Sequence, residues 1–293
     1  MGLRIKTNVE SLNAQRSMGN TTKAIQEDMA KLTSGYRINK SADDAAGLAI
    51  SESLKARTRS LDQAKRNAND GVSLIQIAES SMSEISNILV RMRELATQSA
   101  SDTIGNTERS YTNREYIQLV KEIDRIANST EFNGLPLLKG QDAVGDEEMF
   151  TIHVGAGDGT APNTDTLRIS VEQLETNSEK LGLSMESEIG PLERDGDFNR
   201  ALAAEKLGVL DDALEQVSSN RAYLGTQQSR LGSTINTIGI QIENLSAANS
   251  RIRDVDFAEV TASFTQNKIL QQAGASVLSQ ANTAPEIALA LLR

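Results

Sequence analysis

LDQAKRNANDGVSLIQIAESSMSEISNILVRMRELA, residues 61–96, decides the fold because its apolar residues recur in alternating steps of three and four. That spacing puts them on one face of a helix that packs along its length on other helices. A second apolar stripe runs beside the first, which is typical of a helix in a bundle. The residues expected to pack in this stretch are Leu61, Ile75, Met82, Ile85, Leu89 and Met92.

The second half of the chain carries a matching pattern. Residues 1–135 and 192–284 contain no proline, so no residue of that type breaks a long helix in either stretch. The sequence therefore predicts a mainly α fold, a long helical hairpin or coiled-coil bundle whose two ends meet. The second-half packing residues recur every seven positions and are Leu210, Val217, Leu224, Leu231, Ile238, Leu245 and Ile252.

Three glycines follow these heptad positions directly, at Gly225, Gly232 and Gly239. Glycine destabilises a helix interior by about 1 kcal/mol relative to alanine. Two interpretations stay open: a flank that another backbone approaches closely, or three weak positions that the helix tolerates.

The middle of the chain has a different periodicity. Apolar residues at helical spacing predict a helix over 113–127, and Asn133-Gly134 predicts a turn after it. Apolar and polar residues then alternate over 150–154 and 167–171, which predicts two short strands in a β-hairpin. Residues 176–197 are polar and are expected to connect to the second long helix.

Both ends of the chain are weaker amphipathic helices, over residues 7–34 and 255–281. Isolated helices of this quality are marginal in water, so they need a partner to stay folded. The apolar residues expected to face that partner are Ile25, Leu32, Val260, Phe264, Leu270 and Val277.

Composition and charge exclude several classes of function. The net charge of −10 argues against nucleic acid as a partner, because phosphate binding needs a basic surface. The sequence has no run of 18 apolar residues, so membrane insertion is not expected. Residues 1–10 lack the apolar segment of a secretory signal. Cysteine is absent, which excludes disulfides and thiolate metal sites.

Candidate reactive residues are few. His153 is the single histidine and falls on a predicted strand without companions, so a solvated residue is favoured over a base or metal ligand. A metal hydrolase using Asp43, Asp44 and His153 is therefore a poor reading. The sequence contains no nucleophile paired with a base, no cofactor-binding motif and no residues at the spacing of metal ligands. We expect no enzyme activity, no cofactor and no metal.

Several passages of the chain together resemble bacterial flagellin, the subunit of the flagellar filament, in the family's order. Residues 32–50 read LTSGYRINKSADDAAGLAI and residues 250–256 read SRIRDVD. The remaining passages are 67–79, 91–100, 122–134 and 269–293. Tyr36 and Lys40-Ser41 depart from the usual pattern, and the short middle implies a minimal form without the large variable outer domains.

The resemblance implies a flagellin-core-like fold and a structural role. Residues 1–43 and 251–293 would be inner coiled-coil segments. Residues 44–180 would be the N-terminal part of an outer core, with the long helix, the second helix and the β-hairpin. Residues 181–250 would supply its C-terminal long helix.

The resemblance also implies partners and a location. Subunits would leave the cell through the flagellar type III export channel, helped by an export chaperone and the export gate. They would polymerise into an extracellular filament together with cap and hook-associated proteins. Arg91, Leu95 and Glu115 match the patch that the flagellin-sensing Toll-like receptor of animals contacts.

Two other interpretations compete with the filament subunit. One is a hook–filament junction protein, which shares related termini. The other is a coiled-coil adaptor that binds partner helices and does not polymerise. Electron microscopy after salt precipitation separates them.

Overall fold

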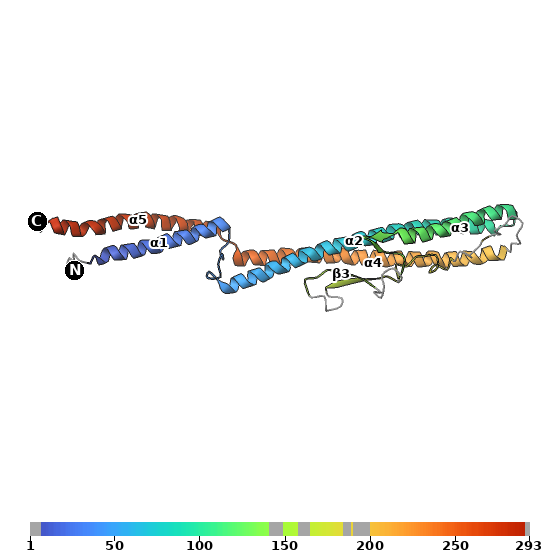
Figure 1. Cartoon of the computed structure of the whole chain (residues 1–293), viewed down its shortest axis with the longest axis horizontal. Coiled ribbons are helices and arrows are strands. Elements are labelled where there is room, and N and C mark those ends of the chain that lie inside the picture. The colour runs from blue at the N-terminus through green and yellow to red at the C-terminus, as the bar shows by residue number, and fades with distance from the viewer. Residues whose placement is uncertain (1–6, 141–148, 158–164, 184–188, 190–199, 291–293) are drawn as a thin grey trace. The chain divides into compact units, whose positions relative to one another are not determined.

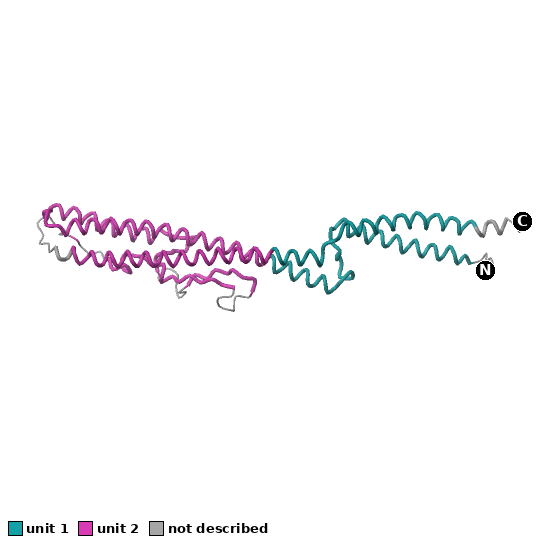
Figure 2. Tube along the Cα trace, turned by 180° about the vertical axis from the view of Figure 1, so that it is seen from behind, with its two compact units in different colours: residues 1–58, 243–293 teal, residues 59–242 magenta. Residues whose placement is uncertain are grey.

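The structure is a computed structural model that describes residues 7–140, 149–157, 165–183, 189 and 200–290. Its described residues are mainly helical, which confirms the predicted fold class. Contacts divide the chain into two compact units (Figure 2). Unit 1 contains residues 1–58 and 243–293, and unit 2 contains residues 59–242.

The long helices follow the two predicted apolar stretches (Figure 1). Residues 61–96 lie inside α2, and the heptad series from Leu210 to Ile252 lies inside α4. The helix predicted over 113–127 begins earlier, at Asn106, where Arg109 of its polar first turns donates to the carbonyls of Ser99, the last residue of α2, and Ser101. The helices are α1 Val9–Ser34, α2 Ala45–Ser99, α3 Asn106–Ser129, α4 Arg200–Arg253 and α5 Phe257–Ala290.

Polar side chains begin these helices where the sequence supplies them. The Oδ1 atoms of Asn8, Asp44 and Asp256 accept hydrogen bonds from backbone N–H groups in the first turns of α1, α2 and α5. Such caps satisfy donors that have no partner within the helix. At its other end α1 stops at Gly35, whose φ of 74° suits glycine.

The strands form two antiparallel pairs, one in each of two short sheets. β1 Glu131–Phe132 pairs with β2 Leu135–Pro136 across Asn133 and Gly134, which both have positive φ. Asn-Gly is the preferred pair for this kind of tight turn. β3 Met149–His153 pairs with β4 Thr166–Ser170, with Phe150 opposite Ile169. The β-hairpin predicted from alternation is confirmed.

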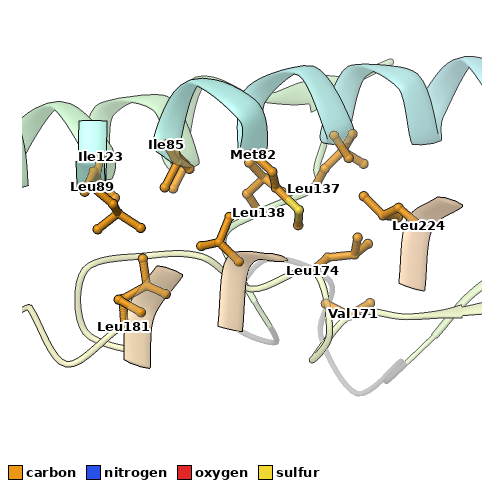
Figure 3. Close-up of a cluster of buried hydrophobic side chains, with 14 of the residues drawn as sticks. Met82, Ile85, Leu89, Ile123, Leu137, Leu138, Val171, Leu174, Leu181 and Leu224 are labelled. Atoms are coloured by element: carbon orange, nitrogen blue, oxygen red, sulfur yellow. The ribbon is translucent and has the colours of Figure 1, made fainter. Parts of the chain in front are cut away.

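Unit 2 has a continuous apolar core (Figure 3). Met82, Ile85 and Leu89 of α2 face residues from α3, α4 and the connecting segments. The segment expected to be a polar connection contributes to this core as well, since Leu181, Leu183 and Ile189 are buried there. Single leucines in a polar run have no periodicity, so the sequence pattern does not reveal them.

Two polar contacts and one glycine attach the β3–β4 hairpin to the helices. The Ser170 N–H donates to the Tyr223 hydroxyl of α4, and the Asn67 amide of α2 donates to the His153 carbonyl. Gly71 of α2 lies under Ile152, whose Cδ1 would be 2.5 Å from an added Cβ. The missing side chain at Gly71 lets the hairpin approach the helix closely.

Candidate assembly surfaces

Helices α1 and α5 pack side by side and antiparallel in unit 1 (Figure 1), and several polar side chains meet in the seam between them. Asp28 is 8% exposed and accepts hydrogen bonds from Ser263 Oγ at 3.0 Å and Asn267 Nδ2 at 3.1 Å. A carboxylate this buried needs such donors, because an unpaired charge in the seam would be strongly destabilising.

The polar contacts continue toward the free ends of α1 and α5. Gln271 Nε2 donates to Thr22 Oγ1 at 3.2 Å, and Ser11 Oγ donates to Asn282 Oδ1 at 2.8 Å. The Asn8 amide donates to the Ala281 carbonyl. Each such bond contributes about 1 kcal/mol net, so the seam aligns the two helices more than it stabilises them.

Many of the large apolar side chains of this helix pair are exposed outside the seam. Of the six predicted inner-layer residues, Leu270 and Val277 are at least half exposed, whereas the other four, Ile25, Leu32, Val260 and Phe264, are partly buried. Exposed apolar patches of this kind mark interaction surfaces. The residues that expose half or more of their surface are Val9, Leu12, Met29, Phe257, Ile269, Leu270 and Val277.

A groove of about 770 Å³ lies between α1 and α5, beside the seam. Met18 and Ala14 line it from α1, and Leu270, Ala273 and Val277 line it from α5. Leu270 also belongs to a second depression, on the face of α5 that begins at Phe257. The terminal pair therefore presents an apolar surface that its own two helices leave unfilled.

The packing residues predicted for unit 2 are buried. They come from both long helices, and none is more than 3% exposed. Leu245 and Ile252, which continue the same heptads into unit 1, are only partly buried. The buried members are Leu61, Ile75, Met82, Ile85, Leu89, Met92, Leu210, Val217, Leu224, Leu231 and Ile238.

The heptad glycines of α4 face open space. A Cβ added at Gly225, Gly232 or Gly239 would meet no described atom within 4 Å. No backbone of the described chain approaches this flank, so a close-approach role would require another molecule.

Arg91 and Glu115 meet on the surface of unit 2, across α2 and α3. Arg91 donates to Glu115 Oε1 through Nε at 3.0 Å and Nη2 at 2.9 Å, and to Glu94 through Nη1. The hydrogen bonds with Glu94 and Glu115 raise the pKa of Arg91. Leu95 is 2% exposed and lies in the core, so the predicted triad presents two polar residues above a buried leucine.

The residues considered for metal chemistry have structural contacts. Asp43 Oδ2 accepts from the N–H groups of Asn39 and Lys40, and Asp44 caps α2. The His153 carbonyl is held by Asn67. Among the described residues, no group of three or more metal-ligating side chains is placed to hold an ion, and no helix has the length and apolar character of a membrane span.

The sequence pattern misses two features of these surfaces. In the sequence, Asp28 looks like any other acidic residue of an amphipathic helix. Its place one turn after Ile25 puts it on the same face as that apolar residue, which is a signal that a partner must supply hydrogen-bond donors. Arg93 of α2 donates to Asp211 of α4 at 2.7 Å, a contact between residues far apart in sequence. Nothing in the spacing of either residue indicates that ion pair.

Long helices around one striped core, with an unfilled apolar surface on the terminal pair, define a structural helical protein. Comparisons with known proteins agree. The family described as the bacterial flagellin N-terminal helical region matches residues 5–143, and the bacterial flagellin C-terminal helical region matches residues 207–292. The chain belongs to the bacterial flagellin family, and it is a structural protein and not an enzyme.

Similar proteins cover almost the whole chain. A flagellin of Halalkalibacterium halodurans is 41% identical over 99% of this chain and 99% of its own length. A flagellar filament 33 kDa core protein of Treponema phagedenis is 40% identical over the same shares. A solved structure of a putative flagellar hook-associated protein from Vibrio parahaemolyticus covers 72% of this chain and 100% of that chain, with a TM-score of 0.60. At 15% identity, that likeness shows the fold alone.

Proposed function

We propose that this chain polymerises into the helical filament of the bacterial flagellum and serves swimming motility from outside the cell. The observation that carries the proposal is the terminal pair α1·α5, which buries polar groups and, among its described side chains, leaves seven large apolar ones at least half exposed. A surface of this kind is unfinished in one molecule and becomes complete when copies stack.

The energetics favour assembly through that surface. Full burial of one large apolar side chain contributes about 1.5–3 kcal/mol. Each of the seven exposed residues is already about half buried, so its further burial contributes roughly half of that value, in sum about 5–11 kcal/mol, which offsets most of the about 4–15 kcal/mol that association costs in lost freedom of motion. A contact between two different faces of identical subunits does not close on itself, so it produces a helical fibre.

The proposed filament has two layers. Residues 1–43 and 251–293 form the inner coiled-coil layer, where Leu270 and Val277 are buried by neighbouring subunits. Residues 44–180 and 181–250 form the outer core. The complete apolar core of unit 2 supports this assignment, because unit 2 needs no second copy to bury its own stripes.

The proposed partners follow from family membership. The chain leaves the cell through the flagellar type III channel, with an export chaperone and the export gate as transient partners. It adds to the filament under a cap protein, next to hook-associated proteins. Absent cysteines suit a chain that has to cross a channel without cross-links.

The test of polymerisation compares the full chain with one that lacks residues 270–293. Both are precipitated with salt, sedimented and viewed by electron microscopy. We expect filaments from the full chain and none from the truncated chain, with the helical circular dichroism of unit 2 retained. Normal filaments from the truncated chain would refute the role of α5, and a full chain that never polymerises would favour the adaptor.

We also propose that the monomer is detected by the flagellin-sensing receptor of animals at the predicted patch of Arg91, Leu95 and Glu115, where Arg91 and Glu115 are exposed and the buried Leu95 supports them from the core. The ion pair of Arg91 and Glu115 supports this, because it places both residues on one exposed face. A reporter-cell assay tests it with Arg91→Ala, and Arg125→Ala is the matched control because Arg125 makes an exposed ion pair with Glu122. Equal responses to both variants would contradict the assignment.

A further inference from the structure

The two connections that join the terminal helices to the long helices are held together by a cluster in unit 1. The Arg37 N–H donates to the Arg253 carbonyl at 2.7 Å, and the Val255 N–H donates to the Gly35 carbonyl at 3.1 Å. These two bonds enclose the bridge between Tyr36 and Asp254. Backbone pairing of this kind fixes the alignment of two segments to a single residue.

Side chains reinforce the same point. The Arg253 guanidinium lies 4.6 Å from the centre of the Tyr36 ring, and its Nη1 donates to Glu52 at 2.5 Å. The Arg37 guanidinium donates to the Ile252 carbonyl at 2.7 Å, near the C-terminal end of α4. A guanidinium suits this place because it can stack on a ring and donate in a fixed plane at once. We call Tyr36, Arg37, Glu52 and Arg253 the linker clamp.

The alignment set at the linker clamp persists along the terminal pair. Eleven residues separate Ser11 from Thr22, and eleven separate their partners Gln271 and Asn282. Equal steps on two antiparallel helices mean that one register runs through both contacts. The apolar side chains of the seam are only partly buried, so a slip by one heptad would cost part of that burial and would also break the polar bonds of the seam.

We propose that the linker clamp sets the axial register of α1 against α5, and that the polar seam only maintains it. The clamp is the part of unit 1 where backbone bonds, a stacked ring and an ion pair act on both connections together. The register within one chain does not depend on the proposed function. Its consequence in the polymer does rest on that function, because there the register would decide which apolar residues neighbouring subunits meet.

The absence of cysteine makes the register directly measurable by disulfide formation. Thr22→Cys with Gln271→Cys reports the observed register, because those side chains are hydrogen-bonded. Thr22→Cys with Leu278→Cys reports a slip of one heptad. Seven residues on α5 place the second site about 10 Å further along, beyond the reach of a disulfide.

Each pair is oxidised in the full chain with the clamp intact and with Arg253→Ala, both in solution and in sedimented polymer. With the clamp intact, only the 22/271 pair should cross-link. With Arg253→Ala, the yield of the 22/271 cross-link should fall at least about twofold, and the 22/278 cross-link should appear. Arg251→Ala is the matched control, since it removes an arginine from the same last turn of α4 and should leave the pattern unchanged.

Tyr36→Ala is a second variant, and it removes the stacked ring from a residue that is 41% exposed, so loss of folding is not a concern. It should produce the same change as Arg253→Ala. Identical patterns in Arg253→Ala, Tyr36→Ala and Arg251→Ala would overturn the inference, and so would no 22/271 cross-link in either fraction. Failure of the cysteine-free chain to polymerise would count against the proposed function alone, because the soluble fraction still reports the register.

Discussion

Unit 2 and the terminal pair α1·α5 use similar amphipathic sequence in opposite ways. In unit 2, Met82, Leu89 and Tyr116 are completely buried between three helices and the segments that connect them. In the terminal pair, Asp28 and Ser11 are buried and Leu270 is half exposed. Two helices alone cannot enclose wide apolar faces, so the difference shows which part of the chain is complete in one molecule.

The largest expected effect tests the complete core. Leu89→Ala should lower the free energy of unfolding by about 2–5 kcal/mol, because it removes a fully buried side chain and leaves a cavity. Urea unfolding followed by circular dichroism measures it. Val90→Ala is the control, since Val90 is 47% exposed and its loss should cost no more than about 0.5 kcal/mol.

A smaller effect should appear at the unfinished surface, and only in assembly. Leu270→Ala should leave urea unfolding of the soluble chain within about 0.5 kcal/mol of the parent. It should raise the critical concentration for polymerisation about fivefold, because Leu270 is already half buried and about 1 kcal/mol of apolar burial between subunits is lost. Sedimentation at a series of concentrations measures this. An unchanged critical concentration together with a destabilised monomer would contradict this prediction, because Leu270 would then stabilise the single chain and not the assembly.

Two glycine substitutions sharpen the comparison at about 1 kcal/mol each. Gly225→Ala should raise the free energy of unfolding by about 1 kcal/mol, since its methyl group enters open space and alanine favours the helix. Gly71→Ala should be about 1 kcal/mol less favourable than Gly225→Ala, because Ile152 has to move away from the new methyl group and this offsets the same helix preference of alanine. If Gly225→Ala stabilises the monomer and yet blocks polymerisation, the glycine flank is a contact between subunits.

The smallest effect concerns pH. Backbone hydrogen bonds from Lys40 and Asn39 lower the pKa of the Asp43 carboxyl. The folded turn therefore favours the ionised form: its contribution is present at neutral pH and is lost as pH falls through the lowered pKa. Asp43→Asn should remove this part of the acid dependence from the 39–44 turn and leave unit 2 unchanged. Amide exchange of residues 39–44 across the acid range measures it, and an identical pH profile for the variant would contradict it.

The sequence by itself determined the mainly α class, the two long helices, the β3–β4 hairpin and most of the unit 2 core. Each of these depends on local periodicity, and the stripe from Leu61 to Met92 is buried as its spacing predicts. Periodicity identifies a face and does not identify what covers it. The same pattern therefore could not show that Leu245 is only partly buried while Leu231 is fully buried.

Only the tertiary structure decided the features that depend on residues distant in sequence. Asp28 meets Ser263, Arg93 meets Asp211, and Arg253 meets Tyr36 and Glu52, although no spacing relates these partners. Leu181 and Leu183 enter the core from a segment whose composition is polar. The physical reason is common to all of them: local sequence sets the direction of a side chain along its own helix or loop, whereas the element that it meets depends on how the whole chain folds back.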